Sequence, residues 1–257
     1  MQPMVVSVGP LVTAAANNIC LSQTPSGAGY LTINGALASG GVATLDTPRR
    51  ILLTTNGNET AKTFTVVGTN WAGNSITEVI TGVTSSTATS VLDYKTVISI
   101  YVSAATAAAV TFGTTTTAAS PWVRFNSWGI PQASIQVVVT GTINYTLQFT
   151  LDDPNSADNP VAPAAMTWTS SGDASLVGAT GTVETYIPVV PVWARILLNS
   201  GTGSARATFV QLGVLCLALF GGLSPAPVPP PTSTNFIITE AGDPLVTETG
   251  DNLVWTA

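Results

Sequence analysis

Within residues 143–150, apolar and polar residues alternate with a period of two, and this pattern constrains the fold more than any other feature of the sequence. The apolar positions are Ile143, Tyr145, Leu147 and Phe149. A period of two places successive side chains on opposite faces of an extended chain, which is typical of a strand with one buried face. No segment carries the 3.6-residue apolar stripe of an amphipathic helix. The sequence therefore predicts an all-β fold.

The composition favours the same fold. Charged residues make up 8% of the chain, against about a quarter in ordinary soluble domains. Thr, Ser, Asn and Gly supply the missing polarity. Thr is β-branched and favours strands, whereas Gly, Asn and Ser favour turns.

Further strand-like runs divide the chain into two parts. They are separated by turns rich in Asn and Gly and cover residues 49–55, 62–67, 75–81, 97–103, 109–113, 134–140 and 193–211. Residues 114–120 resemble a junction, after which Pro121 and Trp122 begin a new unit. We expect two β-sandwich or jelly-roll-like domains, residues 1–120 and residues 121–220.

The C-terminal part of the chain has a different character. Residues 221–234 are rich in proline and predict a stiff, extended linker. Residues 235–257 contain a repeat, in which TEAGDPLV is followed directly by TETGDNLV. We expect a short β-repeat arm that is too small to be stable alone. The arm would dock on a neighbouring subunit, fold back on its own body or remain mobile.

Apolar side chains of this arm and one basic pair of the body are the candidate assembly contacts. Arg49 and Arg50 suit docking to an acidic partner, and the alternative is a strand start with solvated charges. The candidates in the arm are Phe236, Ile238, Leu245, Val246, Leu253, Val254 and Trp255.

The charge balance indicates which kinds of partner the chain can bind. The chain has 7 Lys plus Arg against 13 Asp plus Glu, a net charge of -6. It offers no basic surface for a phosphate backbone, so we expect no nucleic-acid binding. So few charges also give little self-repulsion, and we expect a homo-oligomer, a trimer before a dimer.

The chain lacks the residues on which most catalytic mechanisms depend. The chain has no histidine, which removes the commonest general base and the usual zinc ligand. It also has no glycine-rich phosphate loop, so we expect neither an enzyme nor a cofactor. Asp152, Asp153 and Asp158, with Asn155 and Asn159, offer oxygen ligands for calcium. Their spacing matches no calcium loop, and Asp-Pro-Asn is an ordinary turn, so we expect no metal.

Cysteines and tryptophans allow more than one use. Cys20 and Cys216 are expected to be buried free thiols, with a disulfide as the alternative. Tryptophans can form a carbohydrate-binding platform, but with no common face evident in the sequence we expect core and interface anchors. They are Trp71, Trp122, Trp128, Trp168, Trp193 and Trp255.

Two segments indicate whether the protein is secreted or inserted into a membrane. The N-terminus lacks the basic region of a secretory signal, so we expect synthesis and retention in the cytoplasm. Residues 209–220 are apolar but fall short of the ~20 residues of a membrane span. We expect a buried strand there and no membrane association.

Residues 49–81 carry the strongest resemblance to a known class of proteins. A strand, an Asn-Gly turn, a TFTVVGT strand and a GNSITE strand follow one another, and this order resembles virion structural proteins of tailed bacteriophages. Similar stretches extend over roughly residues 45–211, and the C-terminal repeat is similar to short terminal repeats of phage particle proteins.

The resemblance implies a structural component of the virion, made in the host cytoplasm. The first expectation is a capsid decoration or cement protein, whose partners are the major capsid protein or other virion proteins. The runner-up is a tail, adaptor or fibre-attachment protein. A carbohydrate-binding host-recognition module remains as an alternative from another class.

Overall fold

The computed structural model describes residues 3–126, 129, 132–211, 235–236 and 254–255. In these residues it contains no α-helix, only strands and two 3-10 helices, η1 (Pro163–Ala165) and η2 (Ala174–Leu176). The prediction of an all-β fold is confirmed.

Residues 1–213 form one compact unit, here called the body, and residues 214–257 form another. The strands of the body are β1 (Met4–Val8), β2 (Cys20–Gln23), β3 (Gly29–Tyr30), β4 (Ala38–Ser39), β5 (Val42–Thr55), β6 (Thr63–Thr69), β7 (Ser75–Thr81), β8 (Thr87–Thr89), β9 (Tyr94–Val102), β10 (Val110–Ala119), β11 (Val123–Arg124), β12 (Ala133–Thr140), β13 (Ile143–Thr150), β14 (Thr169–Ser170), β15 (Val183–Ile187), β16 (Trp193–Gly201) and β17 (Ser204–Gln211).

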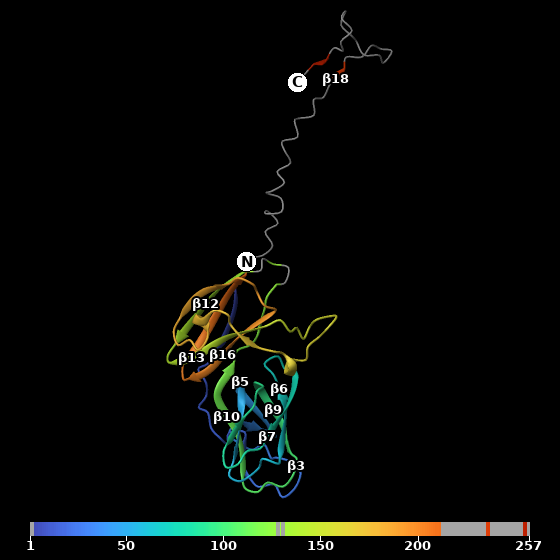
Figure 1. The fold of residues 1–257 in the computed structure, drawn as a ribbon, viewed down its shortest axis with the longest axis vertical. Coiled ribbons are helices and arrows are strands. Elements are labelled where there is room, and N and C mark those ends of the chain that lie inside the picture. The colour runs from blue at the N-terminus through green and yellow to red at the C-terminus, as the bar shows by residue number, and fades with distance from the viewer. Residues whose placement is uncertain (1–2, 127–128, 130–131, 212–234, 237–253, 256–257) are drawn as a thin grey trace, which may run out of the picture. The chain divides into compact units, whose positions relative to one another are not determined.

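These strands form two antiparallel sheets (Figure 1). The smaller sheet has the order β1-β17-β12-β15. The larger sheet has 13 strands, and its main path is β14-β13-β16-β10-β5-β9-β6-β7. Local alternation explains strands such as β6, in which Phe64 and Val66 are buried while Thr63 and Thr65 are half-buried.

The body holds two hydrophobic cores. The C-terminal core lies between the smaller sheet and strands β13 and β16, with residues such as Ile135, Leu147 and Phe209. The N-terminal core lies inside the other half of the larger sheet, which curves so that Phe64 of β6 meets Phe112 of β10 at 5.6 Å between ring centroids.

One strand runs through both cores. The first half of β10 pairs with β5, and its last residues, Ala118 and Ala119, pair with β16. The change of core falls near the predicted junction at residues 114–120, but β1 belongs to the C-terminal core because it pairs with β17. The cores therefore do not follow chain order.

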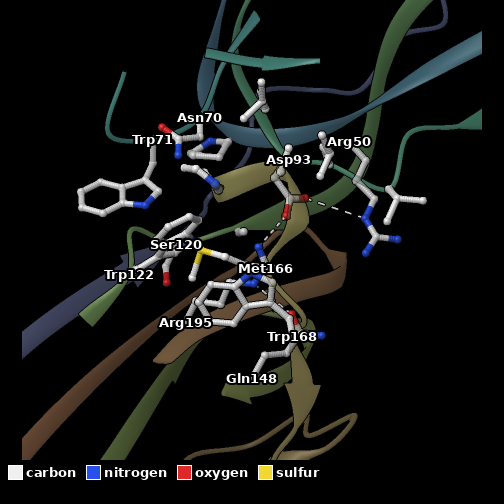
Figure 2. A pocket seen from close by; sticks show the side chains of 17 residues that line it. Arg50, Asn70, Trp71, Asp93, Ser120, Trp122, Gln148, Met166, Trp168 and Arg195 are labelled. Carbon is white, nitrogen blue, oxygen red and sulfur yellow. Dashed lines mark hydrogen bonds and ion pairs between the residues drawn. The ribbon is translucent and has the colours of Figure 1, made fainter. Parts of the chain in front are cut away.

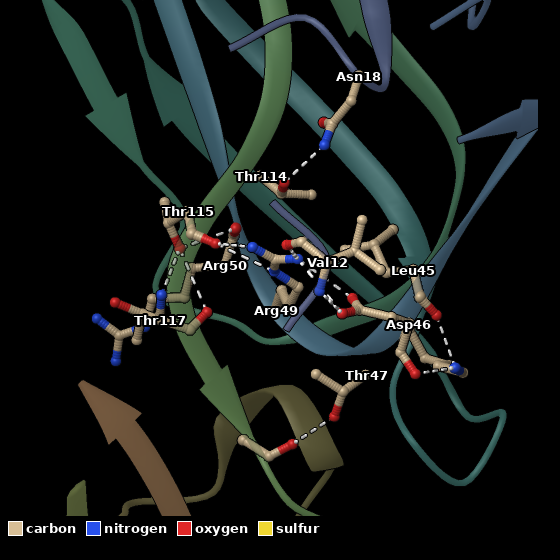
Figure 3. A network of polar contacts seen from close by, with 12 residues as sticks. Val12, Asn18, Leu45, Asp46, Thr47, Arg49, Arg50, Thr114, Thr115 and Thr117 are labelled. Carbon is tan, nitrogen blue, oxygen red and sulfur yellow. Dashed lines mark hydrogen bonds and ion pairs between the residues drawn. The ribbon is translucent and has the colours of Figure 1, made fainter. Parts of the chain in front are cut away.

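The expectation for Arg49 as a surface contact is wrong. Its side chain is 1% exposed and lies where the pairing of β5 with β10 is interrupted between Thr114 and Ala118. The guanidinium donates to the carbonyl oxygens of Thr115 and Val12 and pairs with Asp46 at 3.3 Å (Figure 3). Arg49 thus satisfies backbone oxygens that the irregular ladder leaves open, and it is neither solvated nor free to dock.

In the C-terminal unit, β18 (Asn235–Phe236) pairs antiparallel with β19 (Val254–Trp255). The two ends of the predicted arm therefore meet in a strand pair. The linker at residues 221–234 and the candidate contacts Ile238, Leu245, Val246 and Leu253 lie outside the described residues.

Candidate functional site

Four tryptophans gather in one cluster of the body. The ring of Trp122 lies 5.8 Å from that of Trp71, 5.2 Å from that of Trp168 and 6.1 Å from that of Trp193. The structure thus brings together four tryptophans for which the sequence showed no common face. Trp255 lies in β19, and Trp128 is outside the described residues.

Three members of the cluster line a pocket of about 200 Å³ (Figure 2). Its aromatic lining is Trp71, Trp122 and Trp168. Exposed Val91 and Ala164 also line it, which places its mouth at the surface. Its polar lining consists of Arg50, Asn70, Asp93, Ser120, Gln148 and Arg195.

Strand geometry directs Arg195 into this pocket. On β16, Ala194, Ile196 and Leu198 belong to the C-terminal core, so the alternate positions, including Arg195, face the other way. Arg195 Nη1 donates to Asp93 Oδ2 at 2.9 Å, and Nε donates to Gln148 Oε1 at 3.0 Å. The guanidinium also lies 4.3 Å from the centroid of the Trp168 ring, a cation–π contact.

Asp93 is the one carboxylate among the pocket-lining residues. It directly precedes β9 and is 8% exposed. Burial raises the pKa of Asp93, while the charges of Arg195 and Arg50 act in the opposite direction. Burial likewise lowers the pKa of Arg195, and Asp93 opposes that change. The pair therefore depends on its own hydrogen bond to offset the cost of removing two charges from water.

Four buried atoms of the pocket lining have no hydrogen-bond partner within the described chain. They are Arg50 Nε, Asn70 Nδ2, Trp71 Nε1 and Asp93 Oδ1. Arg50 Nε lies 3.8 Å from Asp93 Oδ1, an ion-pair contact too long for a hydrogen bond. A buried polar group without a partner costs about 1–3 kcal/mol, so these three donors and one acceptor would be stabilised by hydrogen bonds to water or to a ligand in the pocket.

The turn between β6 and β7 fixes the direction of one of these donors. Asn70 Oδ1 accepts hydrogen bonds from the amides of Ala72 and Asn74, at 2.9 Å and 3.0 Å. The side-chain oxygen is therefore committed to the turn, and the amide nitrogen of Asn70 is held at the pocket lining.

The predicted acidic cluster is engaged by protein groups. Asp153 accepts hydrogen bonds from Arg124 at 2.7 Å and from Trp193 Nε1 at 3.3 Å. Asp152 accepts from the amide of Thr167 at 2.6 Å. In the part of the chain that the structure describes, no three His, Cys, Asp or Glu side chains group as a metal site.

Cys20 is fully buried in the N-terminal core. Burial raises the pKa of its thiol to about 12, so the reactive thiolate is suppressed at neutral pH. Cys216 lies outside the described residues.

Fold and pocket together define the class of this protein: an all-β, antiparallel sandwich with a tryptophan-lined polar pocket at the end of β10. Comparison with known protein families, with curated proteins and with solved structures finds no match for the chain. Among the described residues, no helix has the length and apolar character needed to span a membrane.

Three polar residues of the pocket were not predicted from the sequence: Asn70, Asp93 and Arg195. One signal was available for Arg195, which interrupts the apolar run WARILL at residues 193–198 in a chain that is poor in charge. A charge inside such a run must find a buried partner or face a pocket.

Proposed function

We propose that this protein is a structural component of a tailed-phage particle, in the first place a capsid decoration or cement protein. The observation that carries the proposal is the division into a β-sandwich body and a separate C-terminal unit whose described strands, β18 and β19, pair with each other. Together with the proline-rich stretch between body and strand pair, this division suits a body that covers a shell and an arm that attaches it.

The outer face of the larger sheet supports a role in assembly. Tyr30, Tyr101, Thr65 and Val79 are successive cross-strand neighbours on β3, β9, β6 and β7. Tyr30 is 75% exposed and Val79 is 58% exposed, and the two tyrosine rings lie 5.2 Å apart. An exposed row of this kind is typical of surfaces that become covered by a partner. We propose a capsid subunit or a second copy of this chain as that partner, with a trimer before a dimer.

The basic residues support a protein partner over nucleic acid. Of the 7 basic residues, Arg49, Arg50, Lys62, Arg124 and Arg195 are in ion pairs within the body. Lys95 donates to the carbonyl oxygens of Leu45 and Asp46. Few cations therefore remain for phosphates, and a place on the outside of the shell fits this charge distribution.

Binding to particles tests the proposal. Particles that lack the protein are mixed with the full chain or with a variant in which residues 222–257 are deleted, and the bound copies are counted by gel densitometry and particle reconstruction. We expect the full chain to bind in many copies over the shell, and the deletion variant to keep its circular dichroism spectrum but to lose binding. A few copies at one vertex would favour a tail or adaptor protein, and no binding by the full chain would refute a particle role.

A further inference from the structure

We propose that the tryptophan-lined pocket is a binding site for one neutral saccharide ring. The proposal goes beyond a role in particle assembly and rests on the pocket alone. It starts from the four buried atoms without hydrogen-bond partners: three donors, Arg50 Nε, Asn70 Nδ2 and Trp71 Nε1, and one acceptor, Asp93 Oδ1.

The mixture of donors and an acceptor that lack hydrogen-bond partners selects the ligand chemistry. A hydroxyl group both donates and accepts hydrogen bonds, so neighbouring hydroxyls of one ring can satisfy Asp93 Oδ1 together with Asn70 and Trp71. A carboxylate or phosphate only accepts when ionised, so it would leave Asp93 Oδ1 without a hydrogen bond and place a second negative charge beside it. A neutral, polyhydroxylated ligand therefore fits better than an anion.

The walls and the size of the pocket point to a ring. Trp71, Trp122 and Trp168 line it with aromatic surface, which packs against the apolar C–H face of a sugar while the polar edge of the sugar meets the hydrogen-bonding groups. The volume of about 200 Å³ is below the roughly 300–1,000 Å³ of sites for drug-sized ligands. One ring fits this space, and a longer saccharide would extend through the mouth beside Val91 and Ala164.

The site is preorganised. Arg195 is held by Asp93, Gln148 and the ring of Trp168, and Asn70 is held by its turn. Side chains that are already fixed lose little entropy when a ligand binds. Ordered waters are the competing occupant, because they can satisfy the same four atoms.

Titration of the full-length protein with neutral methyl pyranosides tests the site, with binding followed by ligand-detected NMR and calorimetry. The matched panel adds methyl uronides, which carry a carboxylate on the same ring. We expect saturable binding of at least one neutral pyranoside with a Kd on the order of 1 mM, and weaker binding of the corresponding uronide.

Two variants connect that binding to the pocket. Trp71→Phe keeps an aromatic wall but removes the Nε1 donor, and we expect about tenfold weaker binding, the size of one hydrogen bond. Tyr186→Ala removes an exposed aromatic residue that is not part of the pocket lining, and we expect unchanged affinity. Circular dichroism and thermal melting check that both variants fold.

Three results would overturn the proposal: no saturable binding of any neutral pyranoside, binding of uronides alone, or equal affinity of the wild type and the Trp71→Phe variant. The first result would leave water as the occupant of the pocket. None of these results bears on particle binding, so failure of the saccharide site and failure of the particle role are separate outcomes.

Discussion

At the scale of single residues, the body uses its few charges internally to hold irregular backbone in place. Glu59 is fully buried and accepts hydrogen bonds from the amides of Ala107 and Ala108 at 2.8 Å and 3.0 Å, and from Lys62 Nζ at 2.5 Å. It therefore ties the turn before β6 to the loop before β10. Arg49 does the same for the irregular pairing of β5 and β10.

Replacing Glu59 tests this use of charge. Burial alone would raise the pKa of Glu59, but the bonds from Lys62, Ala108 and Ala107 outweigh it and lower the pKa. The folded pKa is then below the unfolded pKa, so the stabilisation is present above the unfolded pKa and is lost as the pH falls through the folded pKa. We expect Glu59→Gln to lower the free energy of unfolding by about 1–3 kcal/mol at pH 7 and by less in acid.

Urea unfolding at neutral and acidic pH measures the effect, and Asp158→Asn is the control because Asp158 is an exposed carboxylate. A Glu59→Gln variant with the same pH dependence of stability as the wild type would refute the role assigned to the carboxylate.

At the scale of elements, β10 is the strand on which both cores depend, and it includes a glycine for a steric reason. A Cβ atom on Gly113 would lie 1.8 Å from the carbonyl oxygen of Ala15 and 2.5 Å from the carbonyl carbon of Ala16. The N-terminal segment crosses β10 at this point, where the amide of Thr114 donates to Ala15 O at 3.0 Å. No side chain fits between the two backbones.

We expect Gly113→Ala to lower the free energy of unfolding by about 3 kcal/mol or more, because the atoms it meets belong to the backbone and cannot move aside cheaply. Gly27→Ala is the matched control, since nothing lies within 4 Å of its added Cβ atom. Chemical denaturation compares the two variants. Equal stability of both would mean that the N-terminal segment does not pack against β10.

Local patterns in the sequence predicted many of the strands, such as β6, β7 and β13, but not the long-range pairing between strands. Alternation identified β6 and β13 because it records which side chains face a core. It carries no information on the pairing of Met4 with Phe209, which joins β1 to β17 across most of the chain. The pocket could not be predicted from local patterns for the same reason. Its tryptophans lie outside the strands, on connections far apart in the sequence: Trp71, Trp122 and Trp168. The burial of Arg49 was not predicted, because two adjacent arginines in a sequence ordinarily lie at the surface.

At the scale of the whole molecule, the two cores of the body are linked by shared structural elements. β10 pairs with β5 beside the N-terminal core and with β16 beside the C-terminal core. The buried pair of Asp93 and Arg195 adds a second link, because Asp93 precedes β9 and Arg195 lies on β16. Loss of either core removes backbone partners and a charge partner from the other.

Calorimetry of the full chain tests this cooperativity. We expect the body to melt in one transition whose calorimetric and van't Hoff enthalpies agree, whereas two resolved transitions in the wild type would show that the cores are independent.

Arg195→Met removes the charged link and leaves Asp93 buried with only the more distant Arg50, which lies 3.8 Å away. Breaking a buried ion pair on one side costs about 3–5 kcal/mol. At roughly 2–4 °C per kcal/mol for a body of this size, we expect the melting temperature to fall by about 10 °C. Because β10 still joins the cores, the variant should keep a single transition. A split transition in this variant alone would assign the coupling to the ion pair rather than to the strand.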